Sequence, residues 1–448
     1  MIYTLNDRPS PGKAVFAAVQ HLMAIFVGII TPPIIVSGAL GFDVQLTSYL
    51  ISMALFASGI STFIQVRKIG PIGSGLLSIQ GTSFAFLSTI IMTGFIVKNA
   101  GGTQEEMLVT ILGVCFFGSF IEMIFSRFIP FLKKIITPLV SGIVVTLIGL
   151  SLIQVGIKDI GGGAWLFDNK PDVFGNPRNL LLALMVLVII IVFNRSRRPW
   201  LRMGAIVFGL IAGYIAATAM GLVNFARIRD LSIVAPPIPF RYGFFKFNWA
   251  AFLPMSLLYL ITTIESMGDL TATSLVSGEP IEGDLYLKRI SGGVLGDGVN
   301  SAIAALLNSF PNTTFSQNNG VIQMTGVASR YVGYYIAGFL CLLGLFPIIG
   351  GIFSIIPNSV LGGATIIMFG TVAASGIRII ASSVINRRGV MIIAISLGMG
   401  LGVVFVPQIL QYLPDFARQI FSSAITTGGL TAIILSIVLP RFPKAERG

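Results

Sequence analysis

The chain has 448 residues, of which 54% are hydrophobic and only 10% are charged. A soluble domain carries about 25% charged residues, so this composition excludes a water-soluble globule of this size. The net charge of +12 would suit nucleic-acid binding, but the basic residues lie mainly in short loops between apolar runs. We therefore expect a membrane-embedded chain and no nucleic-acid partner.

Fourteen transmembrane spans are predicted, each about 20 residues long. Basic pairs such as Arg67-Lys68, Lys133-Lys134 and Arg387-Arg388 concentrate in alternate loops, which predicts that both termini are cytoplasmic. The approximate centres of the spans are Ile25, Ala54, Phe86, Phe117, Val145, Leu187, Leu210, Ile264, Ala302, Gln323, Leu342, Met368, Ile395 and Ile433.

Spans 3 and 10 differ from the others because each contains a polar segment, at 76–84 and 311–320. Both segments are rich in hydroxyl, amide and glycine residues and would not suit a lipid-facing helix. Non-helical backbone survives at membrane depth only where it is buried in protein or lines a cavity. The two interrupted spans occupy corresponding positions in the two halves, which indicates a binding site between them.

The two halves of the chain resemble each other weakly. When residue 140 is aligned with residue 360, Gly142 falls opposite Gly362. When residue 92 is aligned with residue 324, the segments 92–94 and 324–326 both read Met-Thr-Gly. Seven spans is an odd number, so the second half would run inverted relative to the first. Inverted repeats are a signature of transporters, with the site near the midplane.

Acidic residues inside the spans are candidates for the site. Glu265 and Asp269 are four residues apart, which places both on one helix face, although a solvated pair near a span end is the alternative. Asp297 lies in a glycine-rich run that helix packing would explain, and we expect this aspartate to support the site. His21, the only histidine, is either part of this polar network or a satisfied structural residue. Glu122, close to Arg127, is interpreted as an interfacial structural residue.

Span 10 offers paired donors and acceptors at Gln317 and Asn318. A planar heterocycle with alternating N–H and C=O groups needs such an edge, and Phe84 and Phe315 would supply apolar faces. The alternative is that Asn318-Asn319-Gly320 is merely a turn. The sequence has no zinc motif, nucleophile elbow or Walker loop, so we expect no metal, no cofactor and no enzyme activity.

The segment 317–326 resembles the signature of the nucleobase–ascorbate transporters, the nucleobase–cation symporters. Gln20-His21, the run 73–80 and the run 265–273 also resemble the bacterial xanthine permeases of this family. The resemblance covers essentially the whole chain. It implies proton-coupled symport of an oxidised purine, xanthine and in some relatives urate, across the bacterial inner membrane. A uracil or other nucleobase permease, or an anion exchanger or channel on the same fold, is the alternative.

The resemblance also implies an architecture: an all-α polytopic protein of fourteen spans in 7+7 inverted repeats, with short antiparallel strands in spans 3 and 10, often as a homodimer. A core domain would comprise 14–128 and 249–352, and a gate domain 134–222 and 359–440. An elevator-like movement of the core against the gate would alternate access.

The same resemblance implies roles for individual residues. Glu265 and Gln317 would be the main substrate ligands, with backbone near Phe84 contributing. Asn318 would tune specificity, and the supporting polar network would consist of Asp269, Asp297 and His21. Ser83 stands where some xanthine-selective relatives carry asparagine, so this smaller side chain would leave room for the C8 oxygen of urate.

Overall fold

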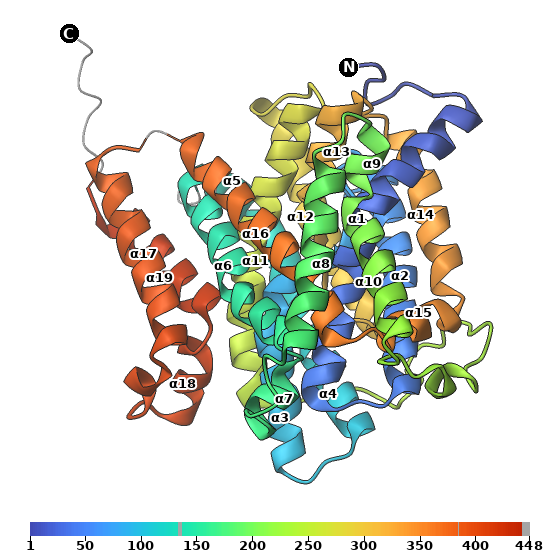
Figure 1. The fold of residues 1–448 in the computed structure, drawn as a ribbon. Helices are drawn as coiled ribbons and strands as arrows, with labels where there is room; N and C mark the ends of the chain where they lie inside the picture. The colour runs from blue at the N-terminus through green and yellow to red at the C-terminus, as the bar shows by residue number, and fades with distance from the viewer. Residues whose placement is uncertain (133–136, 384, 441–448) are drawn as a thin grey trace.

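A computed structural model of the chain describes residues 1–132, 137–383 and 385–440. The pair Lys133-Lys134 and the predicted domain boundary at 134 lie outside these residues. The described chain is mostly helical (Figure 1). The N-terminus and the C-terminal end of the last helix, α19 (Ala424–Val438), lie at the same end of the molecule.

The elements follow one another as short and long helices with one strand in each half. The first half contains α1 (Pro11–Leu40), α2 (Val44–Arg67), β1 (Gln80–Thr82), η1 (Phe84–Phe86), α3 (Leu87–Asn99), α4 (Gln104–Phe125), η2 (Ser126–Phe128), α5 (Ile129–Leu132), α6 (Pro138–Ile160), α7 (Ala164–Asn169), α8 (Pro177–Asn194), α9 (Pro199–Met203), α10 (Ala205–Ala219) and η3 (Phe225–Ile228). The second half contains α11 (Trp249–Val276), α12 (Gly283–Leu306), β2 (Asn312–Thr314), α13 (Gln317–Thr325), α14 (Arg330–Gly344), α15 (Pro347–Ser354), α16 (Asn358–Ala381), α17 (Arg387–Phe405), η4 (Pro407–Leu410), α18 (Asp415–Phe421) and α19.

In the part of the chain that the structure describes, eight helices are long and apolar enough to cross a membrane. A ninth crossing is formed if α14 and α15, which meet at an angle of 75°, are one broken span. Shorter apolar helices cover 84–99, α10 and α19.

Several of the long helices begin at a residue whose side chain accepts a hydrogen bond from a free backbone N–H group. At the start of α4, Thr103 and Glu106 form a reciprocal capping box, in which each side chain accepts a hydrogen bond from the other residue's backbone N–H. The side chain of Asn248 accepts from the backbone N–H of Ala251 at the start of α11.

The two strands meet in the middle of the helical bundle. β1 and β2 pair antiparallel, with Gln80 opposite Thr314 and Thr82 opposite Asn312. All six strand residues are buried. This is the strand pair that the family resemblance implies, and it joins the two polar segments that interrupt spans 3 and 10.

Helices α6 and α16 pack closely because glycines face the contact. A Cβ atom at Gly149 would lie 2.3 Å from the backbone N of Ala373, and one at Gly376 would lie 2.3 Å from the backbone N of Thr146. Small residues allow such close approach of membrane helices. The glycine-rich run of α12 packs in the same way, since a Cβ at Gly292 would lie 2.6 Å from the carbonyl oxygen of Gly73.

Candidate functional site

A small cavity of about 20 Å³ lies beside the strand pair. Its lining comes from η1, α6, α11, β2, α13 and α16, so segments from both halves of the chain enclose it. A cavity of this size holds about one water molecule. The residues that line it are Phe84, Val145, Ile148, Glu265, Asp269, Thr313, Thr314, Phe315, Ser316, Gln317 and Val372.

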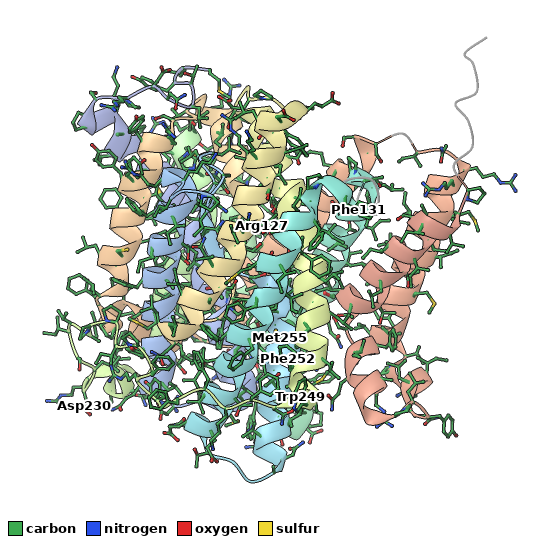
Figure 2. The ribbon with its side chains drawn as sticks, turned by 180° about the vertical axis from the view of Figure 1, so that it is seen from behind. Arg127, Phe131, Asp230, Trp249, Phe252 and Met255 are labelled. Carbon is green, nitrogen blue, oxygen red and sulfur yellow. The ribbon has the colours of Figure 1, made fainter. Side chains whose placement is uncertain are left out.

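The two carboxylates reach the cavity from the middle of α11. This 28-residue helix begins at Trp249, near the end of the molecule away from Arg127 (Figure 2). Glu265 is 8% exposed and Asp269 is 3% exposed, so the alternative of a solvated pair at a span end is wrong. Glu265 Oε2 and Asp269 Oδ1 are buried and have no hydrogen-bond partner among the described residues.

Unpartnered acceptors in a buried position are costly, because desolvation is not repaid by a hydrogen bond. These two oxygens therefore require a donor: a bound proton, water or a ligand that offers N–H groups. The geometry thus provides acceptor capacity that the protein's own described donors leave unused.

Gln317 lines the cavity at the first position of α13. The following residues Asn318, Asn319 and Gly320 continue this helix, so the alternative of a simple turn is wrong. The Nδ2 group of Asn318 donates to the carbonyl oxygen of Leu77 at 2.5 Å, and Asn318 does not line the cavity. The amide of Gln317 is therefore the one that span 10 presents to this space.

Two phenylalanines bound the cavity on its apolar side. Phe84 packs edge-on against Phe369, with ring centroids 5.5 Å apart. The ring of Phe315 lies so close to the backbone of α1 and β1 that a Cβ would fall 2.8 Å from it at Gly28 and 2.5 Å at Gly81. Both phenylalanines are more than nine-tenths buried, and they would offer flat faces to a planar ligand.

A further apolar wall comes from α6 and α16. Val145 and Ile148 project from α6 and Val372 from α16, and none of the three can form a side-chain hydrogen bond. No sequence pattern predicts their role, because an apolar residue in an apolar span carries no local signal. Only their place in the fold distinguishes them from residues that face lipid.

Asp297 lies behind the polar wall, fully buried and held by two donors. The hydroxyl of Ser266 donates to Asp297 Oδ2 at 2.5 Å, and Gln65 Nε2 donates to Asp297 Oδ1 at 2.8 Å. Gln65 also accepts from the backbone N–H of Ser74 at 2.7 Å. Gln65 is absent from the residues predicted from sequence, although an amide in the apolar run of span 2 is a usable signal.

The remaining predicted residues lie outside the cavity lining. His21 is fully buried beside Asn318, and its role in the supporting polar network stays a prediction. Ser83 is 1% exposed, directly before Phe84. Glu122 is 2% exposed and lies on α4, which packs against α11 and α12; its position at the membrane boundary stays a prediction. In the described ranges, no group of three or more His, Cys, Asp or Glu side chains is arranged to hold a metal ion.

Comparison with known proteins identifies close relatives. The Permease family matches residues 12–409. The chain is 50% identical to xanthine permease XanP of Escherichia coli K12 over 444 residues, which cover 98% of this chain and 95% of the relative. It is 49% identical to xanthine permease XanQ of the same strain, with 98% and 94% covered. A xanthine permease of Bacillus subtilis is 33% identical, with 97% and 96% covered.

Solved structures share the fold at low sequence identity. The transmembrane domain of the cyanobacterial bicarbonate transporter BicA matches with a TM-score of 0.61 at 16% identity, covering 93% of this chain and 99% of that domain. The murine anion transporter Slc26a9 in its inward-facing state matches with a TM-score of 0.63 at 11% identity, covering 97% and 69%. These likenesses establish a polytopic membrane fold and nothing about the substrate.

Proposed function

Because this chain belongs to the permease family of nucleobase–ascorbate transporters, we propose that it carries xanthine, and urate more weakly, into the cytoplasm together with a proton. It is a multi-pass membrane transporter rather than an enzyme. The observation that carries the proposal is the convergence of Glu265, Asp269 and Gln317 on one buried cavity between two phenylalanines. Two relatives that are about half identical to it bear the name xanthine permease.

The chemistry of the cavity suits an oxidised purine. Xanthine presents alternating N–H and C=O groups along its edge, and the free Glu265 oxygen would accept from ring N–H groups. The Gln317 amide would make a bidentate contact, because it offers a donor and an acceptor side by side. The carboxyl of Glu265 or Asp269 would take up the coupled proton, since a buried carboxylate without a donor is costly.

Transport requires that the cavity enlarge, since about 20 Å³ is too small for a purine. The proposed core domain (14–128 and 249–352) supplies Phe84, α11 and α13. The proposed gate domain (134–222 and 359–440) supplies the wall from α6 and α16. An elevator-like displacement of core against gate would open this boundary first to one side and then to the other.

Fourteen spans in inverted repeats remain the proposed arrangement. Support comes from the observation that all fourteen expected centres lie in helical elements, with Phe86 in η1 and Gln323 in α13. The pairing of β1 with β2 and of α6 with α16 also favours it, since each pair joins matching positions of the two halves. We further propose the inner membrane as location, both termini cytoplasmic, and a homodimer.

The experiment is uptake of radiolabelled xanthine into proteoliposomes with an inwardly directed proton gradient. Accumulation that an uncoupler abolishes is the expected result, and a competition panel of xanthine, urate, hypoxanthine, guanine and uracil would rank the substrates. Uptake that persists unchanged without a proton gradient would reject proton coupling.

The competing proposal, an anion exchanger or channel, starts from the low-identity fold relatives. A site for a small anion would more naturally use cationic groups or open helix N-termini than two neighbouring carboxylates. Bicarbonate or chloride flux that xanthine does not inhibit would favour this alternative. A uracil permease would instead show uracil as the strongest competitor in the panel.

A further inference from the structure

A second pocket, remote from the substrate cavity, opens at the end of the molecule where the N-terminus lies. Its volume is about 450 Å³, and three segments form it: the loop after α2, the end of α4 with η2 and α5, and the first turns of α12. Its lining residues are Lys68, Gly70, Pro71, Arg127, Pro130, Leu287, Lys288, Ser291, Gly292 and Leu295. None of these residues lines the substrate cavity.

The charge of this pocket has one sign. Lys68, Arg127 and Lys288 contribute three cations, and the lining contains no carboxylate. Within residues 1–132, 137–383 and 385–440, no carboxylate lies within ion-pairing distance of these three side chains. The neighbouring Arg289, by contrast, is neutralised by Glu279 at 2.6 Å. Three uncompensated cations around one hollow form a site for an anion.

The same helix ends present apolar side chains outward. Phe128 is 54% exposed and Phe131 is 67% exposed, and Figure 2 shows Phe131 in the same upper half of the molecule as Arg127. Leu287 and Leu295 add an apolar side to the pocket itself. A pocket that combines cations with an outward apolar rim matches a molecule with an anionic head and apolar tails.

Lys68 is held in an unusual backbone conformation, with φ 56°. This is the left-handed region, which a residue with a side chain rarely adopts and which glycine adopts freely. Such strained residues cluster at functional sites, and Lys68 lines this pocket despite the backbone strain.

The pocket wall is connected to the support of the substrate site. The backbone N–H of Gly73 donates to the carbonyl oxygen of Gly292 at 2.7 Å, which fixes the loop to α12. The next residue, Ser74, donates its N–H to Gln65, whose amide donates to Asp297. A ligand bridging the loop, the η2–α5 segment and α12 would therefore brace the segments that hold this network.

We propose that this pocket binds the phosphate headgroup of an anionic phospholipid from the leaflet on the N-terminal side, with Lys68, Arg127 and Lys288 as the phosphate ligands. Basic pockets between membrane helices on the cytoplasmic side recognise such headgroups. The acyl chains lie along the exposed surface around Phe128 and Phe131. The site stabilises the helix bundle and is separate from the transport reaction.

The test measures phosphatidylglycerol binding to the detergent-solubilised full chain, by native mass spectrometry and by the lipid-induced shift of the unfolding temperature. Phosphatidylglycerol should bind and raise the unfolding temperature, and phosphatidylcholine should do neither. The triple variant Lys68→Gln/Arg127→Gln/Lys288→Gln should weaken phosphatidylglycerol binding by about 100-fold, since each cation contributes roughly fivefold. Equal affinity in the triple variant and the wild type would overturn the proposal.

Three controls separate a specific site from general charge. The variant Arg195→Gln/Arg197→Gln/Arg198→Gln removes three exposed cations from the loop between α8 and α9 and should keep wild-type binding. Equal loss in this control would overturn the site. Saturation by inorganic phosphate or glycerophosphoglycerol at the same concentration as the lipid would overturn the lipid as its occupant.

Lys68→Gly separates binding from folding. Because glycine relieves the left-handed strain, this variant should unfold at the same or a higher temperature without lipid, yet bind phosphatidylglycerol about fivefold more weakly. Unimpaired binding by Lys68→Gly would remove this lysine from the site.

Arg127→Lys keeps the charge and should retain most of the binding, whereas loss equal to that of the triple variant would indicate a structural role instead.

Discussion

The two sides of the proposed substrate cavity differ in what they could do to a ligand. α11 and α13 present carboxylate and amide groups, with Glu265 Oε2 and Asp269 Oδ1 lacking partners among the described residues. α6 and α16 present Val145, Ile148 and Val372, which offer only apolar contact. The first wall is able to read the edge of a heterocycle, and the second is able to cover it or to slide past it.

This difference suggests a division of labour. Hydrogen bonds impose strict geometry, whereas apolar surfaces tolerate displacement, so a moving boundary is best placed on the apolar side. Near this boundary, the hydroxyl of Ser141 on α6 donates a hydrogen bond to the carbonyl oxygen of Ile264 at 3.2 Å. Substitutions on the polar wall should therefore change recognition, and those on the apolar wall should change the rate of transport.

Glu265→Gln tests the polar wall at its strongest point. Glutamine keeps the shape but removes the charge, the titratable proton and half of the acceptor oxygens. Accumulation of xanthine should fall by about 100-fold or more, because a lost charge-assisted contact and a lost proton site combine. The measurement is uptake in energised vesicles, normalised to protein in the membrane.

Glu282→Gln is the matched control for Glu265→Gln. Glu282 is exposed before α12 and its side chain makes no capping hydrogen bond, so this variant should transport normally. Near-normal accumulation by Glu265→Gln would rule Glu265 out as a ligand.

Gln317→Asn tests the amide of the polar wall, because asparagine is one methylene shorter than glutamine. The amide would no longer reach the substrate edge, leaving polar groups unpaired, and affinity for xanthine should fall by about 10- to 100-fold. Competition binding across the purine panel checks this, with Gln411→Asn at an exposed site as control. An unchanged affinity for every purine would place Gln317 outside the recognition edge.

Much of the fold follows from sequence because the signals are local. Apolar runs reveal the helices, and Glu265 and Asp269 are conspicuous because carboxylates are rare in membrane spans. The polar interruptions at 76–84 and 311–320 indicate non-helical backbone in the same way, whereas the antiparallel strands there are implied only by the family resemblance. Each of these features differs in polarity from the residues around it, so it can be recognised in a single sequence.

The missing parts depend on tertiary placement. Val145, Ile148 and Val372 differ in nothing local from lipid-facing residues, and only packing brings them to the cavity. Glu122 is predicted to be interfacial because Arg127 follows it in the sequence, and its burial by other helices carries no local signal. Ser83 and Asn318 are close in sequence to cavity residues, but their side chains are buried outside the lining.

Gly149→Ala tests the apolar wall. The new Cβ would lie 2.3 Å from the backbone N of Ala373, so α6 and α16 must separate, at a cost of about 1–3 kcal/mol in unfolding free energy. Because Ile148 adjoins this contact, the maximal rate of uptake should fall several-fold, roughly in line with that energy, while KM changes little.

The control for this prediction lies on the same helix pair. A Cβ added at Gly370 would have no neighbouring atom within 4 Å, so Gly370→Ala should preserve both rate and stability. A raised KM at an unchanged maximal rate in Gly149→Ala would mean that the apolar wall also takes part in recognition, and the proposed division would fail.

Ser83→Asn should have the smallest effect, because it acts through a neighbour. Xanthine and urate share the edge that Glu265 and Gln317 would read, and they differ mainly at C8, on the far side of the ring system. Ser83 is buried and directly precedes Phe84, which lines the cavity, so we expect a larger asparagine to shift this segment and to crowd the C8 oxygen of urate. Urate binding should weaken by about 1 kcal/mol relative to xanthine, the lower end of what a small steric change in a pocket produces. The measurement is the ratio of urate to xanthine inhibition constants, with Ser83→Ala, which adds no volume, expected to keep the wild-type ratio. If Ser83→Asn also keeps that ratio, the wall around Phe84 does not face C8, and the selectivity between the two purines must be sought on the apolar side formed by α6 and α16.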